Sequence, residues 1–209
     1  MKKALLIGSV ITLISCSAMA ATQNVTTSNN PNQAMDMQNM PHMANMQNPQ
    51  AQFQDGQIVE IIKVIDKGEI SSSKEASKKA TGPVVKKFAD FMIAAHSKNL
   101  RDTENVSKQA KIHAKASDQS KALKQQGKQE LKSLKSAPAG QFDVVYINFM
   151  VQDHQAALNL IDTQLLPSAS NPALKKQLQM TRMAVAHHLE AAQKIQAGLN
   201  KLSQTTTSR

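Results

Sequence analysis

The stretch Phe88-Ala-Asp-Phe-Met-Ile-Ala-Ala-His-Ser-Lys-Asn-Leu100 carries the helical pattern that decides the fold. At about 100° per residue its apolar side chains share one broad arc, which contains Phe88, Phe91, Met92, Ala95 and Leu100. His96 falls inside the same arc. A single histidine on such a face is more often a hydrogen-bonded core residue than a ligand. Three other segments repeat the pattern, however, and each also has an ionisable residue on the face it should bury.

The composition points to the same fold class. A chain of 209 residues is long enough for one domain with a sizeable core. Aromatic residues make up only 3% and there is no Trp, while Gly and Pro number seven each. These proportions suit a helical protein packed with Leu, Ile, Val, Met and Ala better than a sandwich or barrel. We therefore expect an all-α protein.

The N-terminus has the features of a secretory signal peptide. Met1-Lys-Lys3 is a short basic region, and the apolar run after it is too short to span a bilayer. Ala18-Met-Ala20 is an A-x-A cleavage site, so the mature chain would start at Ala21. Leu13-Ile-Ser-Cys16 also matches a lipobox, which would leave a lipidated Cys16 at the new N-terminus. Either way we expect a periplasmic or secreted protein without an internal disulfide, since Cys16 is the only cysteine.

Positive charge is concentrated in one region. The net charge of +10 becomes +8 when Lys2 and Lys3 leave with the leader, and residues 98–135 hold ten basic residues against four acidic ones. Few aromatic rings are available to stack on bases, so nucleic acid is a poor partner. The pattern is typical of a solvated lysine-rich helical face. An anionic envelope surface, bound through Lys98 to Lys135, is the functional alternative.

A polar segment rich in methionine follows the leader. From Ala21 to about Gln54 the chain is dominated by Asn, Gln, Thr, Ser, Pro and Met with little periodicity, which predicts disorder. Within twelve residues it places Met35, Met37, Met40, His42, Met43 and Met46. Thioethers are soft donors that suit Cu(I) or Ag(I), and methionine is flexible enough to gather around one ion. A soft-metal site and a compositionally biased tether both remain open.

Hydrophobic periodicity predicts four long helices, at residues 57–80, 84–108, 142–166 and 173–202. A shorter helix is expected at residues 121–134, after a lysine-rich crossover. Gly82-Pro83 and Ala137-Pro-Ala-Gly140 separate the helices, and Asn171 followed by Pro172 is typical of a helix start. The architecture that follows is an up-down four-helix bundle with the extra short helix in the crossover. The domains are then a signal peptide (1–20), a disordered tail (21–55), the bundle (56–203) and a disordered C-terminus (204–209).

Each long helix carries an ionisable group on or beside its apolar stripe: Glu69, His96, Asp153 with His154, and His188. Burying an isolated charge costs several kcal/mol, so such groups pair with one another or share a cation. We predict a metal site of Glu69, His96, His154 and His188, with Asp153 and Tyr146 in the outer shell. One carboxylate with imidazoles suits Zn, Cu, Fe or Mn.

Two further observations bear on this site. His187 should point to solvent and serve as an internal control for His188. The two Glu and two Glu-x-x-His motifs of diiron bundles are missing, which argues against a diiron oxidase. The bland alternative is that the inward groups are buried but scattered, each satisfied locally by a carbonyl or a hydroxyl.

Several short motifs occur together in the predicted helices: Gly68-Glu69 to Ala80, Val84 to Met92 with His96, Phe142-Asp143, Tyr146, Asp153-His-Gln155 and His188-Leu189. They resemble those of a bacterial family of secreted domains of unknown function, the family numbered four-one-four-two. The resemblance covers about residues 57–202 and implies a ferritin-like bundle in a secreted protein, with no established activity. Ala95 stands where that family usually has an Asp, and the lysine-rich crossover is longer than usual.

The leading functional hypothesis is a non-catalytic envelope protein that binds a transition metal, linked to copper or oxidative-stress handling. The alternative is a structural or interaction module whose buried His, Asp and Glu are only polar core groups. A metalloenzyme that uses the inward cluster is a third, weaker hypothesis. The sequence has no nucleophile elbow, phosphate loop or zinc-protease motif, so no hydrolase or transferase class is supported.

Overall fold

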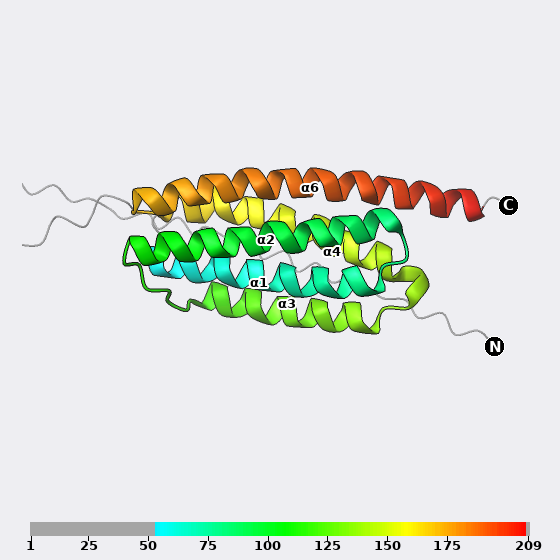
Figure 1. Ribbon diagram of the computed structural model, residues 1–209, viewed down its shortest axis with the longest axis horizontal. Coiled ribbons are helices and arrows are strands. Elements are labelled where there is room, and N and C mark those ends of the chain that lie inside the picture. The colour runs from blue at the N-terminus through cyan, green and yellow to red at the C-terminus, as the bar shows by residue number, and fades with distance from the viewer. Residues whose placement is uncertain (1–52, 208–209) are drawn as a thin grey trace, which may run out of the picture. The chain divides into compact units, whose positions relative to one another are not determined.

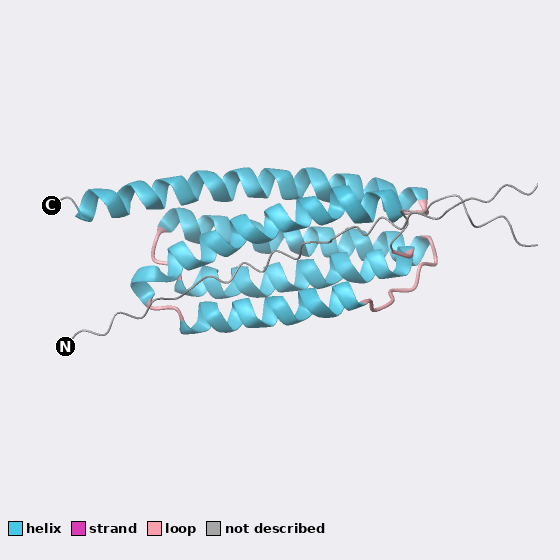
Figure 2. Ribbon diagram, turned by 180° about the vertical axis from the view of Figure 1, so that it is seen from behind, coloured by secondary structure: helices cyan, strands magenta, loops and turns pink. Residues whose placement is uncertain are grey.

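The computed structural model describes residues 53–207, and side chains as far as residue 201. Every regular element in this part of the chain is a helix, as Figure 2 shows, which confirms the all-α prediction. The long helices are α1 (Asp55–Lys79), α2 (Pro83–Gln109), α4 (Ala139–Leu160) and α6 (Pro172–Thr207). The predicted signal peptide, Cys16 and the methionine-rich segment 35–46 lie outside the described residues.

The long helices form two antiparallel hairpins, α1 with α2 and α4 with α6 (Figure 1). Between them α3 (Asp118–Ser136) packs along α1 and carries the chain back to the other end of the bundle. As a result, α2 and α4 run in the same direction. One long crossover of this kind is the connection of ferritin-like bundles. The predicted bundle with an extra helix in its crossover is therefore confirmed.

The turn between α1 and α2 is fixed by the second hairpin. The carboxylate of Asp143, near the start of α4, accepts hydrogen bonds from the N–H of Thr81 (3.0 Å), the hydroxyl of Thr81 (3.1 Å) and the N–H of Gly82 (2.7 Å). A Cβ on Gly82 would lie 2.9 Å from an oxygen of Asp143. The position is therefore glycine because the carboxylate approaches the backbone closely.

The turn between α4 and α6 is held in turn by the first hairpin, through a carboxylate of α1. Asp55, in the first turn of α1, accepts hydrogen bonds from the N–H and hydroxyl of Ser170 and from the N–H of Asn171. The side-chain oxygen of Asn171 then accepts from the N–H groups of Ala173 (2.9 Å) and Leu174 (3.1 Å). This satisfies the first donors of α6, and the predicted Asn171 cap is confirmed.

The crossover helix is longer than the periodicity predicts. α3 begins at Asp118 rather than near residue 121, because Ser117 and Ser120 form a reciprocal capping box with distances of 2.9 and 3.1 Å. The loop before it lies against the start of α1, where the N–H of Lys115 donates to the carbonyl of Gly56 at 2.9 Å. A Cβ at Gly56 would collide with the carbonyl of His113.

The third long helix, α4, does not end where the sequence predicts. A π-turn at Ile161–Leu165 (η1) and one further turn at Leu166–Ser168 (α5) extend it past Pro167, beyond the predicted end at residue 166. The N–H of Leu166 bonds to the carbonyl of Ile161, which widens the turn. Pro167, which has no N–H, then fits at the start of α5.

The core has two apolar clusters with a polar layer between them. One cluster gathers around Ile58, Ile61, Leu165 and Leu174, and the other around Phe88, Phe142, Tyr146 and Met150. Between them each long helix contributes buried polar side chains: Asp66 and Glu69 from α1, His96 from α2, His154 from α4, and Thr181 and His188 from α6. The two clusters hold the helices at a fixed separation on both sides of this layer.

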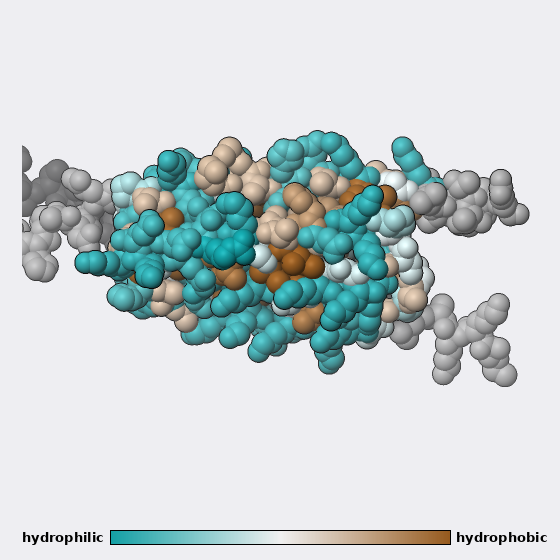
Figure 3. Space-filling model, viewed as in Figure 1, coloured by the Kyte–Doolittle hydropathy of each residue, from teal (hydrophilic) through white to brown (hydrophobic). Residues whose placement is uncertain are grey.

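The surface is mainly polar. In Figure 3 hydrophilic residues cover most of the visible face, with small separate apolar areas between them. Phe91 is 52% exposed, so the predicted buried arc of α2 was wrong at this position; the buried arc passes through Val85, Ala89 and Met92 instead. No helix in the described residues is long and apolar enough to cross a membrane.

Candidate metal centre

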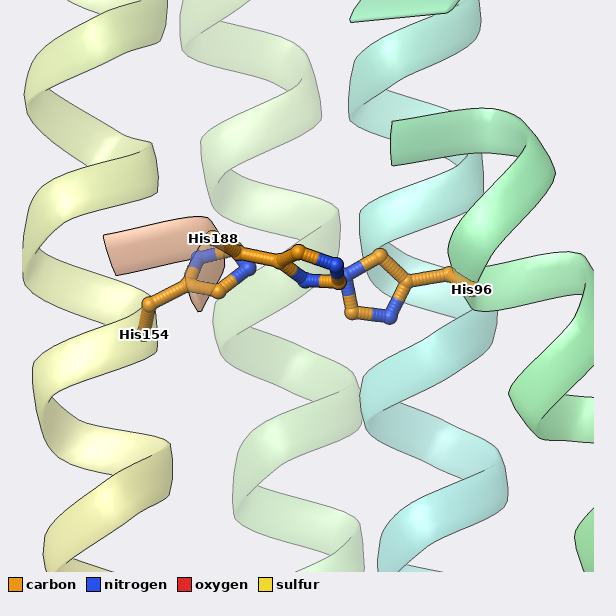
Figure 4. Close-up of side chains that lie close together, drawn as sticks. All are labelled: His96, His154 and His188. Atoms are coloured by element: carbon orange, nitrogen blue, oxygen red, sulfur yellow. The ribbon is translucent and has the colours of Figure 1, made fainter. Parts of the chain in front are cut away.

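Three histidines from three helices meet in the polar layer (Figure 4). His96, His154 and His188 are 3%, 2% and 4% exposed. Their ring centroids lie 5.2 to 5.5 Å apart in each pairing. Each residue offers one ring nitrogen, and these nitrogens lie within 4.8 Å of one another. The three side chains therefore form a group that can hold a metal ion.

A chain of hydrogen bonds orients His96. Thr181 (2.7 Å) and Gln177 (3.0 Å) donate to the side-chain oxygen of Asn99, which turns the amide nitrogen of Asn99 towards Asp66. That nitrogen donates to both oxygens of Asp66, at 3.2 and 3.0 Å. Asp66 also lies 2.9 Å from Nδ1 of His96. An ionised Asp66 accepts a hydrogen bond from Nδ1–H, so that Nε2 of His96 keeps its lone pair.

His154 is oriented by its own helix. Its Nδ1 lies 2.8 Å from the carbonyl oxygen of Met150. A carbonyl only accepts, so Nδ1 carries the proton and Nε2 carries the lone pair. Nε2 of His154, Nε2 of His96 and Nδ1 of His188 are all buried without a hydrogen-bond partner. Leaving a buried polar atom unpaired costs about 1–3 kcal/mol, so this convergence needs an explanation.

Burial keeps the rings of His154 and His188 neutral. Desolvation, followed by the neighbouring His96 and His188, lowers the pKa of His154 to about 3. Desolvation, followed by His96 and His187, lowers the pKa of His188 to about 4. Neutral imidazole is the form that binds metal, so the lone pairs of these two rings are available at neutral pH without proton release.

The dimensions are close to those of a metal site. Three nitrogens no more than 4.8 Å apart lie within about 2.8 Å of a common centre, whereas a metal–imidazole bond is about 2.0–2.1 Å. Small rotations of the rings would therefore bring all three to bonding distance.

The other residues predicted for this site are not part of the group of three histidines. Glu69 is buried, but the compact group found in the described residues contains only the three histidines. Asp153 was expected to orient an imidazole; instead it accepts from Gln126 at 3.2 Å. Tyr146, also expected in the outer shell, shares a 2.9 Å hydrogen bond with Ser73, and burial raises the pKa of its hydroxyl. His187 is exposed, as expected.

Glu69 and Asp153 face a separate cavity of about 260 Å³ between α1, α3 and α4. Burial, followed by Asp153 and Glu130, raises the pKa of Glu69 well above its usual value. Burial and then Glu130 raise the pKa of Asp153 to about 7. Nearby carboxylates therefore add to the effect of burial on the pKa values of Glu69 and Asp153.

Sequence reasoning overlooked Asp66 and Glu130. Asp66 follows Ile62 by four residues and precedes Glu69 by three, so it lies on the same buried face of α1. That spacing was a usable signal. Glu130 had no such signal, because its role depends on how α3 packs against the bundle.

A family model for "Domain of unknown function (DUF4142)" matches residues 39–195. The chain belongs to the DUF4142 family. The predicted family is thus confirmed, and the match spans all four long helices except the C-terminal end of α6. No curated protein sequence matches the chain.

Two solved structures share the fold. A fragment of a DUF305 protein from Deinococcus radiodurans has a TM-score of 0.60 at 13% identity, and CopM in its Cu(II)-bound form has a TM-score of 0.55 at 17% identity. Each comparison covers 71% of this chain and 99% of the other. At these identities the likeness establishes the helical architecture of this DUF4142 protein and nothing about its ligand.

Proposed function

We propose that the protein binds one Cu(I) ion through His96, His154 and His188 and holds it without catalysing a reaction. The observation that carries this proposal is the set of three buried, unpartnered ring nitrogens that face one centre. Core histidines that were merely structural would have local partners for both ring nitrogens. A bound ion supplies the missing partner to all three.

The charges around the centre favour a monovalent ion. The cost of burying an ion grows with the square of its charge, so a divalent ion loses about four times as much hydration energy as a monovalent one. His154 and His188 are neutral there, and Asp66 is the carboxylate paired with a ring of the centre. The single positive charge of Cu(I) would then be balanced by the single negative charge of Asp66.

The number of ligands points the same way. Imidazole suits Cu, Zn, Fe and Ni. Zinc takes four protein ligands in structural sites and three with a bound water in catalytic sites, whereas the compact group in the described residues offers three buried nitrogens. Cu(I) is satisfied by three. CopM, which shares the fold, has been solved in a Cu(II)-bound form, and this supports copper as the first metal to test.

The proposed location is the cell envelope, because the leader reads as a secretory signal peptide. There the methionine cluster of residues 35–46 would offer a second, thioether-based site for Cu(I) or Ag(I). The two sites differ in donor atoms, which makes them separable by spectroscopy.

The decisive experiment is anaerobic Cu(I) titration of the full, tag-free chain against a chromogenic chelator, followed by copper X-ray absorption. We expect nitrogen scatterers at about 2.0 Å in the native protein and their loss in His154→Ala and His188→Ala. His187→Ala, one residue from His188 but exposed, is the matched control and should behave as native. Sulfur scatterers alone in the native protein, or equal Cu(I) binding by all four proteins, would overturn the proposal.

A further inference from the structure

We infer that the cavity between α1, α3 and α4 is a second cation site, which binds a partly hydrated divalent ion of the Mg²⁺ and Mn²⁺ class through Glu69, Glu130 and Asp153. This inference does not rest on copper binding by the histidines. It concerns different side chains, different donor atoms and a different part of the bundle.

The first argument is the state of Glu69. Its side chain comes from α1 and lines the cavity, and the residue is only 7% exposed. Its Oε2 atom is buried and has no hydrogen-bond partner. A buried carboxylate oxygen without a donor is costly, and the cost disappears when a cation occupies the adjacent space.

The second argument is the balance of charge in the lining. Three carboxyl groups from three helices face the cavity, and none of the residues that line it is Lys, Arg or His. The chain has 25 basic residues, so a compensating side chain was available. Yet no salt bridge among the described residues involves Glu69, Glu130 or Asp153. The amide of Gln126 donates to two of them, at 2.7 Å to Glu130 and 3.2 Å to Asp153, and the Asp153 and Glu130 side chains also share a hydrogen bond.

The third argument is size, and it selects the class of ion. The carboxylate oxygens do not form a group as compact as the histidines, so they do not close around a bare ion. A volume of about 260 Å³ has room for an ion with several waters, at about 30 Å³ for each water. Mg²⁺ retains waters and binds through one or two carboxylates, and oxygen ligands also suit Mn²⁺. Further amide and hydroxyl oxygens, from Ser72 and Asn159, line the same space.

The room is provided by small residues. Gly68 and Gly127 line the cavity on α1 and α3, and a Cβ placed on Gly68 would meet no atom within 4 Å. A larger side chain at Gly68 would therefore enter open space. This gives a way to block the site without changing any carboxylate.

The test is a Mn²⁺ titration of the full chain followed by electron paramagnetic resonance, which measures free Mn²⁺. We expect one Mn²⁺ per native chain, displaced by excess Mg²⁺. Glu69→Gln should weaken Mn²⁺ binding at least tenfold, and so should Gly68→Leu. Glu190→Gln is the matched control, because Glu190 is an exposed carboxylate paired with Lys194, and it should bind as native.

His96→Ala distinguishes the two centres and should bind Mn²⁺ as native does. No Mn²⁺ binding by the native chain would overturn the inference. Native-like binding by both Glu69→Gln and Gly68→Leu would do the same, as would loss of Mn²⁺ in His96→Ala. The copper proposal can fail while this result stands, since Cu(I) is absent from the titration.

Discussion

His154 and Asp153 are neighbours on α4, yet they face regions of opposite chemistry. The side chain of His154 points towards a centre of three imidazoles. The charged group paired with this centre is the carboxylate of Asp66, which contacts one of the rings. Asp153 turns, one residue and about 100° away, towards a roomy cavity of carboxyl groups. Nitrogen donors in a tight buried space suit a soft or borderline ion, and oxygen donors in a wet space suit a hard one. Neighbouring residues on a single helix thus face a set of nitrogen donors and a set of oxygen donors.

The largest expected effect is a contrast between these two neighbours. His154→Ala should weaken Cu(I) binding more than a hundredfold, beyond the 10–100-fold typical of losing an outer-shell partner. Asp153→Asn should leave Cu(I) affinity within about threefold of native, because Asp153 makes no hydrogen bond to an imidazole. Competition with a Cu(I) chelator measures both. Equal losses in the two variants would mean that the regions are one site.

The pH dependence of stability should sharpen the comparison next. His154 and His188 have folded-state pKa values of about 3 and about 4, below the unfolded value of 6.5. Between these values the unfolded chain binds more protons, so stability is lost as pH falls below 6.5. Each ring contributes a slope of up to about 1.4 kcal/mol per pH unit.

Urea denaturation of the metal-free protein between pH 7 and pH 4.5 measures this slope. His154→Gln removes one titrating group and should reduce the slope by about 1.4 kcal/mol per pH unit near pH 5. His187→Gln, at an exposed position, should leave it unchanged. An unaltered slope in His154→Gln would show that the ring is not held neutral.

A smaller effect is expected from the residue that orients His96. Asp66→Asn keeps the shape of the side chain but removes its charge. Cu(I) affinity should fall about 10–100-fold, because Nδ1 of His96 loses its charged acceptor. Mn²⁺ binding should not change. Native Cu(I) affinity in Asp66→Asn would show that the charge balance proposed for the centre is wrong.

Helical periodicity predicted most of the fold and part of the candidate site, and α4 shows where it fails. The bundle, its crossover helix and the inward direction of His96 and His188 follow from helical periodicity, which depends only on local spacing. On α4 the apolar stripe is wide, with Val145 and Phe149 only partly buried at its edge. Periodicity therefore does not distinguish Asp153 from His154 as the buried group, and the structure buries His154. Which of the two neighbours faces the histidines depends on the packing of α4.

The acidic cavity was beyond sequence reasoning for a different reason. Glu69 was recognised as inward-facing, but which group it faces depends on the packing of α3 against α1. Glu130 lies on that crossover helix, whose position is set by contacts distant in sequence. Periodicity identifies the face that a helix buries, and it does not identify the neighbour.

The carboxyl groups of the cavity should give the stability of the fold a pH dependence opposite in sign to that of the histidines. The folded-state pKa of Glu69 is raised above 4.5, chiefly by burial, so its contribution to stability is present at low pH and is lost as pH rises through the folded pKa. Glu69→Gln should therefore stabilise the cation-free protein at pH 8 by about 1 kcal/mol, or about 2–4 °C in Tm. Near pH 4 the native protein and Glu69→Gln should have the same Tm. Destabilisation at pH 8 would show that Glu69 has a partner in solution.

The smallest expected effect tests whether the cavity between α1, α3 and α4 is open, and a substitution at Gly68 measures it. In the middle of α1 a glycine costs roughly 0.5–1 kcal/mol relative to alanine, so Gly68→Ala should stabilise the protein by about that amount if the added methyl group enters open space. The structure predicts this, because a Cβ at Gly68 meets nothing within 4 Å. Gly56→Ala is the contrasting variant and should destabilise, since its Cβ collides with the carbonyl of His113. Urea denaturation of both variants compares the two positions on one helix.

Cu(I) affinity should be native in Gly68→Ala, because the methyl group faces the cavity and not the imidazoles. A destabilised Gly68→Ala would show that the space is closed by packing in solution, and no hydrated ion would then fit there.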